Sequence, residues 1–207
     1  MTGDDIDPAA TPLSEWLDRL AQAHGSPGGG AACAVMTAIA AALLGMVAAY
    51  TADSPQARLA VQRLGVRRRA VMTAAEEDGI RSAAFGAALA MDEGPERERA
   101  VRQASVDAIA STLTVGRLGA SLVDDVRLLD DIGNRHVEAD LLVAVEALRA
   151  ALEGANVTAR ANLDLLARHR TNDDGLDEQI VAFERGIRDL AEKRAELERL
   201  ATNKRSE

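Results

Sequence analysis

Apolar residues recur along most of the chain at the spacing of α-helices. Leu13, Trp16, Leu17 and Leu20 fall at i, i+3, i+4 and i+7, which predicts a short amphipathic helix with one apolar face. Proline and glycine clusters divide the rest of the chain, because these residues start and stop helices. The further helices are expected over residues 31–50, 55–90, 95–132, 137–166 and 176–197.

This series of segments predicts an all-α fold. The chain has few runs of β-branched or aromatic residues from which a sheet could be built. The segment 95–132 carries small residues in steps of four and three, the pattern of close helix packing. We therefore expect an elongated helical bundle of about five to six helices.

Residues 31–50 form an uncharged segment that is long enough to cross a bilayer. It is mostly alanine, and no Lys or Arg lies close enough to its ends to orient it in a membrane. A helix buried on all sides in the core is therefore favoured over a transmembrane span, and no membrane partner is expected.

The last segment has the heptad pattern of a packed amphipathic helix. Leu176, Ile180, Phe183, Ile187 and Leu190 alternate steps of four and three. Packing against the rest of the chain is one interpretation, and a coiled-coil contact with a second subunit is the alternative.

The composition of the chain indicates what kind of core, partner and location to expect. Aromatic residues make up 2% of the 207 residues and hydrophobic residues 47%, so an aliphatic core is expected. A net charge of −9 repels phosphate backbones and argues against a nucleic-acid partner. Cys33 cannot form an internal disulfide, and the first residues lack a secretory signal. A cytoplasmic location is therefore expected.

A glycine-rich bend, Ser26-Pro27-Gly28-Gly29-Gly30, precedes the alanine-rich segment. Main-chain N–H groups at a helix start can hold a carboxylate or an electron-rich ring, and glycines let a ligand approach closely. The bend lacks the preceding strand of a dinucleotide site and the Gly-Lys-Ser/Thr of a phosphate loop, so no nucleotide is expected. A plain interhelical turn is the alternative.

The bend and the helix after it resemble the formiminotetrahydrofolate cyclodeaminase and methenyltetrahydrofolate cyclohydrolase family. The matching residues are Ser26-Pro27-Gly28-Gly29-Gly30-Ala31-Ala32, Met46-Val47 and Thr51. Later counterparts of family motifs are Asp78, Gly133-Asn134, Ala139-Asp140 and Asn162. The resemblance touches most of residues 13–165.

The resemblance implies a metal-free folate enzyme that forms homodimers, with a tetrahydrofolate derivative as substrate and its site in a cleft near the glycine bend. It implies hydrolysis of 5,10-methenyltetrahydrofolate or cyclodeamination of formiminotetrahydrofolate. The expected division is a disordered tail over residues 1–12, the family's helical domain over 13–170 and the heptad helix over 171–207.

Both reactions need a proton acceptor, and a carboxylate can also stabilise a cationic one-carbon centre. The family match implies Asp140 or Asp78 in this role, with Asn134 as hydrogen-bonding partner. The ligand-binding residues that it implies are Ser26, Pro27, Gly28, Gly29, Gly30, Thr51, Asn162 and Arg102.

The chain departs from the family pattern at several positions. Asp92-Glu93 stands where the family commonly has Pro-Lys, Ala139 replaces a serine, and Thr158 stands in register with an asparagine. Two other functions therefore remain open. One is a catalytically altered relative that binds folate or another small ligand, and the other is a structural helical assembly protein.

Overall fold

The computed structural model describes residues 9–23, 26–171 and 175–204, and within these ranges the chain is helical without β-strands. The elements are α1 Leu13–Leu20, α2 Gly29–Ala49, α3 Pro55–Leu89, α4 Pro95–Ala120, α5 Val123–Ile132, the 3-10 turn η1 Arg135–Val137, α6 Glu138–Arg168 and α7 Asp177–Lys204. The predicted all-α fold is confirmed. The tail predicted over residues 1–12 falls largely outside the described residues, and so does part of the turn before α7.

Helix starts follow the local capping chemistry. The Ser54 side chain accepts a hydrogen bond from Ala57 N–H at 3.3 Å, and Pro55 occupies the first turn of α3. Gly94 precedes Pro95 with φ at 156°, a backbone conformation that favours glycine. These two turns set the antiparallel course of α2, α3 and α4.

One expected helix is divided in the structure. The segment 95–132 is two helices, because the chain turns at Ser121-Leu122 between α4 and α5. In contrast, α6 runs without a break through Gly154. A Cβ on Gly154 would lie 2.5 Å from Cys33 Sγ, so this glycine allows α2 and α6 to approach closely.

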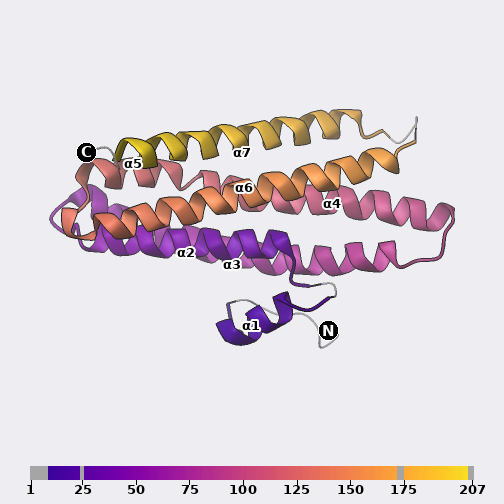
Figure 1. The fold of residues 1–207 in the computed structure, drawn as a ribbon, viewed down its shortest axis with the longest axis horizontal. Coiled ribbons are helices and arrows are strands. Elements are labelled where there is room, and N and C mark those ends of the chain that lie inside the picture. Colours follow the sequence, from indigo (N-terminus) through magenta and orange to yellow (C-terminus); the bar gives the residue numbers. More distant parts are fainter. Residues whose placement is uncertain (1–8, 24–25, 172–174, 205–207) are drawn as a thin grey trace.

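Helices α2, α3, α4 and α6 form the body of an elongated bundle, and α7 lies along α4 and α6 (Figure 1). Helices α3, α4 and α6 extend beyond the start of α2, while α1 lies to one side (Figure 1). The core is aliphatic and includes Leu44, Leu64, Ile109, Leu113 and Leu148. The start of α2 therefore lies part-way along the bundle.

The heptad face of α7 is buried within the chain itself. Phe183, Ile187 and Leu190 lie in the main core. A Cβ on Gly116 of α4 would lie 2.5 Å from Leu190 Cδ1, so this glycine makes room for the α7 leucine. The interpretation of a helix packed on the body is confirmed, and this face is not free for a coiled-coil partner.

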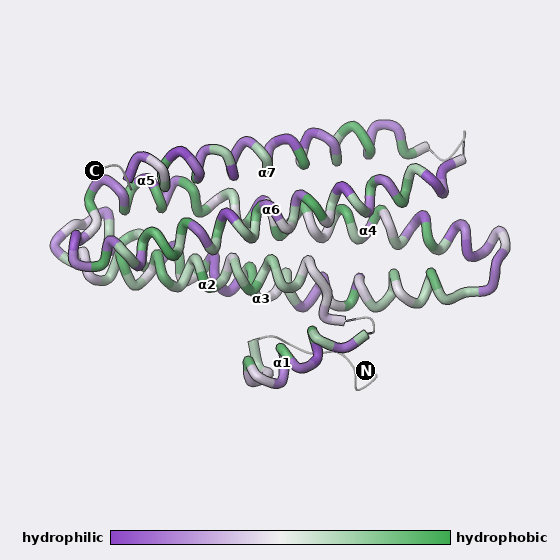
Figure 2. The backbone as a smooth tube through the Cα atoms, viewed as in Figure 1, coloured by the Kyte–Doolittle hydropathy of each residue, from purple (hydrophilic) through white to green (hydrophobic). Residues whose placement is uncertain are grey.

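Helix α2 departs from the expectation of burial on all sides. Figure 2 shows hydrophobic green dominating α2 and hydrophilic purple dominating α7. Yet Ile39 is 47% exposed, and Val35, Met36, Leu43 and Met46 are partly exposed beside it. One face of α2 therefore presents an uncharged, apolar stripe to the outside of the chain.

Two helical segments, Gly29–Ala49 and Pro95–Ile132, are long and apolar enough to cross a membrane by length and composition. Inside the bundle 56% and 61% of their apolar windows are buried. Core helices of water-soluble bundles satisfy the same criterion, so composition alone does not make either segment a membrane span.

Candidate functional site

Asp78 of α3 lies directly against the glycine bend. A Cβ on Gly30 would collide with the Asp78 carboxylate, so only glycine leaves room for this contact. The carboxylate accepts hydrogen bonds from Ser111 Oγ at 3.0 Å and from the main-chain N–H of Ala31. The bend is therefore built around an acidic side chain from another helix.

Burial raises the pKa of Asp78 above its ordinary value, since only 4% of the residue is exposed. The hydrogen bonds from Ser111 and Ala31 and the positive charge of Arg81 act in the opposite direction but do not cancel this effect. A raised pKa makes the carboxylate a better proton acceptor, and a carboxyl group that accepts a proton can also return it, as general acid–base catalysis requires.

A cavity of about 280 Å³ opens beside Asp78, beyond the start of α2. Its walls come from α2, α3, α4 and α6, so it exists only once four helices have packed. The lining residues are Gly29, Gly30, Asp78, Arg81, Ser82, Phe85, Gly86, Ala108, Thr112, Thr158 and Asn162. The structure thus brings together Gly29, Gly30, Asp78 and Asn162 from the residues expected to form the site.

The first residues of the bend pack against α3 beside this cavity. Pro27 is buried, and a Cβ on Gly28 would lie 3.3 Å from Ser82 Oγ. Ser26 Oγ lies beside Gly79, where an added Cβ would be 2.9 Å away. Ser26 and Gly28 therefore lie against α3, whereas Gly29 and Gly30 line the cavity.

Two other expected site residues, Thr51 and Asn134, lie at the opposite end of α2. Thr51 Oγ1 accepts a hydrogen bond from Asn134 N–H at 3.1 Å, and Asn134 Nδ2 donates to the carbonyl of Tyr50 at 3.0 Å. Asn134 Oδ1 also accepts from His136 N–H. Asn134 therefore fastens the turn after α2 to the turn before α6.

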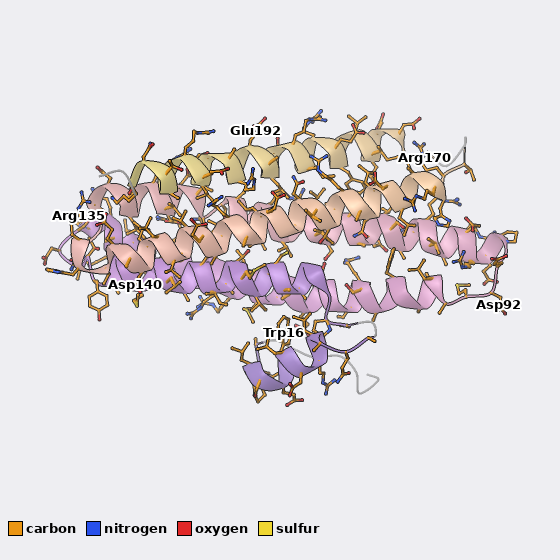
Figure 3. The ribbon with its side chains drawn as sticks, viewed as in Figure 1. Trp16, Asp92, Arg135, Asp140, Arg170 and Glu192 are labelled. Carbon is orange, nitrogen blue, oxygen red and sulfur yellow. The ribbon has the colours of Figure 1, made fainter. Side chains whose placement is uncertain are left out.

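The 21 residues of α2 separate the glycine bend from Thr51 and Asn134 by about 30 Å. Asp140 lies in the first turn of α6, where a carboxylate interacts favourably with the helix dipole. Figure 3 places Asp140 near Arg135, at the end of the bundle opposite Asp92. Within one chain, Asp140, Asn134 and Thr51 therefore lie outside the cavity at the glycine bend, and the roles that the family match implies for them stay predictions.

Arg102 also lies outside the cavity lining. Its Nη1 donates to the carbonyl of His169 at 2.9 Å, and His169 Nδ1 lies 2.6 Å from Glu98 Oε2. The hydrogen bond from His169 holds the pKa of Glu98 below its ordinary value. These contacts join the start of α4 to the end of α6, so Arg102 has a structural partner.

Sequence reasoning missed several residues of the cavity. Ser111 is 33 positions from Asp78, and no pattern in the chain links the two. Phe85 offered a signal, because the chain has only two phenylalanines. Arg81 also lines the cavity, and its positive charge opposes the rise in the pKa of Asp78 that burial causes.

The departures from the family pattern lie mostly away from the cavity. Asp92 and Glu93 are exposed in the turn between α3 and α4, at the far end of the bundle (Figure 3). Ala139 is exposed beside Asp140. Of the altered positions, Thr158 is the one among the described cavity residues.

The chain matches the model of a known protein family. The family model described as "Formiminotransferase-cyclodeaminase" matches residues 12–179. The chain belongs to this family. The resemblance inferred from the glycine bend is thereby confirmed.

Two similar proteins extend the comparison. A methenyltetrahydrofolate cyclohydrolase of Methylorubrum extorquens is 26% identical over 186 residues, which cover 84% of each chain. The crystal structure of a formiminotetrahydrofolate cyclodeaminase from Thermotoga maritima superposes with a TM-score of 0.76, at 21% identity, over 94% of this chain and 98% of the other. The latter shows a shared fold.

Proposed function

We propose that this protein is an enzyme that acts on the one-carbon group bridging N5 and N10 of a tetrahydrofolate derivative in the Asp78 cavity. The observation that carries the proposal is Asp78 itself, a buried carboxyl group with a raised pKa that faces a glycine bend. Family membership supports folate one-carbon chemistry. Hydrolysis of 5,10-methenyltetrahydrofolate is the reaction to test first, because the sequence relative carries that activity in its name.

Asp78 is placed to move the protons of this reaction. As a carboxylate it would accept a proton from the water that attacks the cationic methenyl carbon. The protonated acid would then give this proton to the ring nitrogen as the bond between that nitrogen and the carbon breaks, while the hydroxyl group on the carbon loses its remaining proton to solvent and becomes the formyl carbonyl. In cyclodeamination, the same group would take a proton from the attacking N10 and deliver one to the departing ammonia. Desolvation strengthens the attraction between the carboxylate and the cationic carbon.

Other cavity residues are suited to holding the pterin ring. Ser82, Thr158 and Asn162 supply polar side chains, and Phe85 supplies an apolar surface. Gly29 is exposed and has no Cβ, so a ring can approach the first turn of α2 closely.

The test is the loss of methenyltetrahydrofolate absorbance at neutral pH, compared with the buffer rate. Wild-type protein is expected to accelerate this loss, and Asp78→Asn is expected to lower the enzymatic rate by about 100-fold or more. Ammonia release from formiminotetrahydrofolate, measured in parallel, separates the two reactions. A protein that accelerates neither reaction would contradict the proposal.

A binding protein without catalysis is the second candidate, and Thr158 favours it. This residue lines the cavity where the family has an asparagine, so one ligand-facing amide is replaced by a hydroxyl. Titration calorimetry with tetrahydrofolate distinguishes the two functions. Tight binding without turnover supports the second candidate, whereas turnover excludes it.

We also propose a cytoplasmic homodimer in which a second copy covers the apolar stripe of α2. Ile39 and its neighbours are uncharged and exposed, and exposed Val143 and Val157 lie on α6, which packs beside α2. Light scattering is expected to give twice the chain mass for wild type and the single mass for Ile39→Arg. A monomeric wild type would contradict this part of the proposal.

A further inference from the structure

Helix α3 carries a row of exposed side chains on the face that points away from the core. The row consists of Leu59, Val66, Thr73, Ile80 and Ala87, and its spacing of seven residues keeps it on one side of the helix. Leu59 is 61% exposed, Val66 58% and Ile80 50%. We call this row the α3 seam. Large apolar side chains that recur along one exposed face indicate a contact with another molecule.

The two halves of the seam have complementary shapes. Beside its second half, a groove of about 790 Å³ lies between α3 and α4. Ile80 lines this groove together with short side chains of both helices, chiefly Ala84, Ala87, Ala100 and Ala104. The first half of the seam instead presents two branched side chains, Leu59 and Val66, to the outside. One half is therefore a ridge and the other borders a hollow.

The two halves of α3 also carry opposite charges. Residues 55–75 contain five arginines and no acidic residue, whereas residues 76–78 are all acidic. Two of the arginines pair with Asp125 of α5. Arg69 and Glu77 are exposed, and neither takes part in an ion pair within the described residues. Each half of α3 thus offers charges that a molecule of opposite polarity can match.

A second copy of the same helix matches both the shape and the charge. When the second α3 runs antiparallel and a two-fold axis passes by Thr73, residues equally far from Thr73 on either side lie opposite each other. Val66 then lies over Ile80 of the second copy, and Arg69 lies opposite Glu77 of the second copy. In a parallel pair, arginines would face arginines, so the charges favour the antiparallel arrangement.

We propose that the α3 seam binds a second copy of this chain in the antiparallel arrangement, with Leu59 and Val66 of each copy in the groove between α3 and α4 of the other. The contact is separate from the apolar stripe of α2 and does not involve Asp78. Only three seam residues are large and apolar, so the interface is small and its Kd is on the order of 10–100 μM. The contact therefore dissociates in dilute solution and forms as the concentration is raised.

Disulfide trapping tests the position of the axis. Thr73→Cys places one thiol of each copy at the axis, so oxidation of concentrated protein is expected to give a disulfide-linked dimer on a non-reducing gel. The native Cys33 is buried and does not compete. Gln62→Cys is the matched control, because Gln62 is exposed on the same helix but lies about 33 Å from its equivalent in the antiparallel pair. Both variants also carry Ile39→Arg, which removes the contact proposed for α2.

A charge swap tests the pairing itself, again with Ile39→Arg present. Sedimentation equilibrium is expected to show monomers that dimerise as the concentration rises. Arg69→Glu should raise the Kd about tenfold, because the two-fold axis replaces two attractive pairs by two repulsive ones. Adding Glu77→Arg reverses both partners of each pair and should return the Kd to within about twofold of the starting protein. Circular dichroism establishes that each variant keeps its helix content.

Three results would overturn the proposal. Equal trapping of Thr73→Cys and Gln62→Cys would show random collision in place of a defined axis. A double variant that associates as weakly as Arg69→Glu would show that Arg69 and Glu77 do not face each other. Ile39→Arg protein that stays monomeric at every concentration would leave the seam to a different protein. None of these results depends on turnover, so the proposed function is tested separately.

Discussion

Polar side chains lie at both ends of α2, but their roles differ. At the Gly30 end, Asp78 is buried, has a raised pKa and borders a cavity. At the Thr51 end, the side chain of Asn134 is bonded to Tyr50 and His136 in a turn. The hydrogen bonds of Asn134 stabilise two turns, whereas Asp78 also borders open space and is available for chemistry.

The largest expected effect is a loss of turnover caused by a substitution at the glycine-bend end of α2. In Gly30→Ala the new Cβ displaces the Asp78 carboxylate, and we expect turnover to fall about 100-fold, as for a misplaced catalytic group. Gly45→Ala on the same helix is the control, since a Cβ there meets nothing within 4 Å. Equal rates for the two variants would show that the contact between Gly30 and Asp78 is not needed.

The second effect is on stability and depends on pH. The pKa of Asp78 has its ordinary value of 3.8 in the unfolded chain and is higher in the folded chain. Between these values the folded state binds more protons, so the contribution of Asp78 to stability falls as the pH rises. Above the folded pKa, the ionised group is a net cost.

Asp78→Asn cannot ionise, and we therefore expect it to raise the Tm at pH 7 even though it removes activity. The gain should shrink as the pH is lowered toward 3.8, the ordinary value of the aspartate. Thermal unfolding followed by circular dichroism at several pH values measures this. A lower Tm at pH 7 would indicate that Asp78 is a structural group.

The third effect is a loss of stability caused by a substitution at the Thr51 end of α2. Asn134→Ala removes the hydrogen bonds to Tyr50 and His136. We therefore expect the free energy of unfolding, measured in urea, to fall by about 1–2 kcal/mol. Turnover at the temperature of the assay should remain within about twofold. Asn203→Ala, at an exposed position of α7, is the control and should change stability by less than about 0.5 kcal/mol. A large loss of turnover in a folded Asn134→Ala would place catalysis at this end.

The smallest effect concerns Arg102. Arg102→Lys retains the charge but weakens the hydrogen bond to the His169 carbonyl. We expect the free energy of unfolding, measured in urea, to fall by about 0.5 kcal/mol. The Kd of tetrahydrofolate should not change, because Arg102 is not among the described cavity residues. A weaker Kd would return Arg102 to the ligand-binding set.

The fold was largely predictable from the sequence, because proline and glycine clusters mark most helix ends. The turn at Ser121-Leu122 has no such marker, since both residues are compatible with a continuing helix. The glycine bend, Asp78 and Asn162 were also predictable from the family motif.

The rest of the site depends on packing that the sequence does not display. Ser111 reaches Asp78 only because α3 and α4 lie side by side. Asp140 matched a family motif equally well, yet it lies at the other end of the bundle (Figure 3). A motif identifies residue types and their order along the chain, but only the packed helices show which side chains share a cavity.

The most direct measurement compares Asp78→Asn with Asp140→Asn in the methenyltetrahydrofolate assay, with both proteins confirmed as folded. Asp78 borders the cavity, whereas Asp140 lies in the first turn of α6, at the opposite end of α2. A large loss is therefore expected from the first substitution and a rate within about twofold of wild type from the second. The reverse result, with Asp140→Asn inactive and Asp78→Asn active, would contradict the assignment of the catalytic carboxyl group to the glycine-bend end.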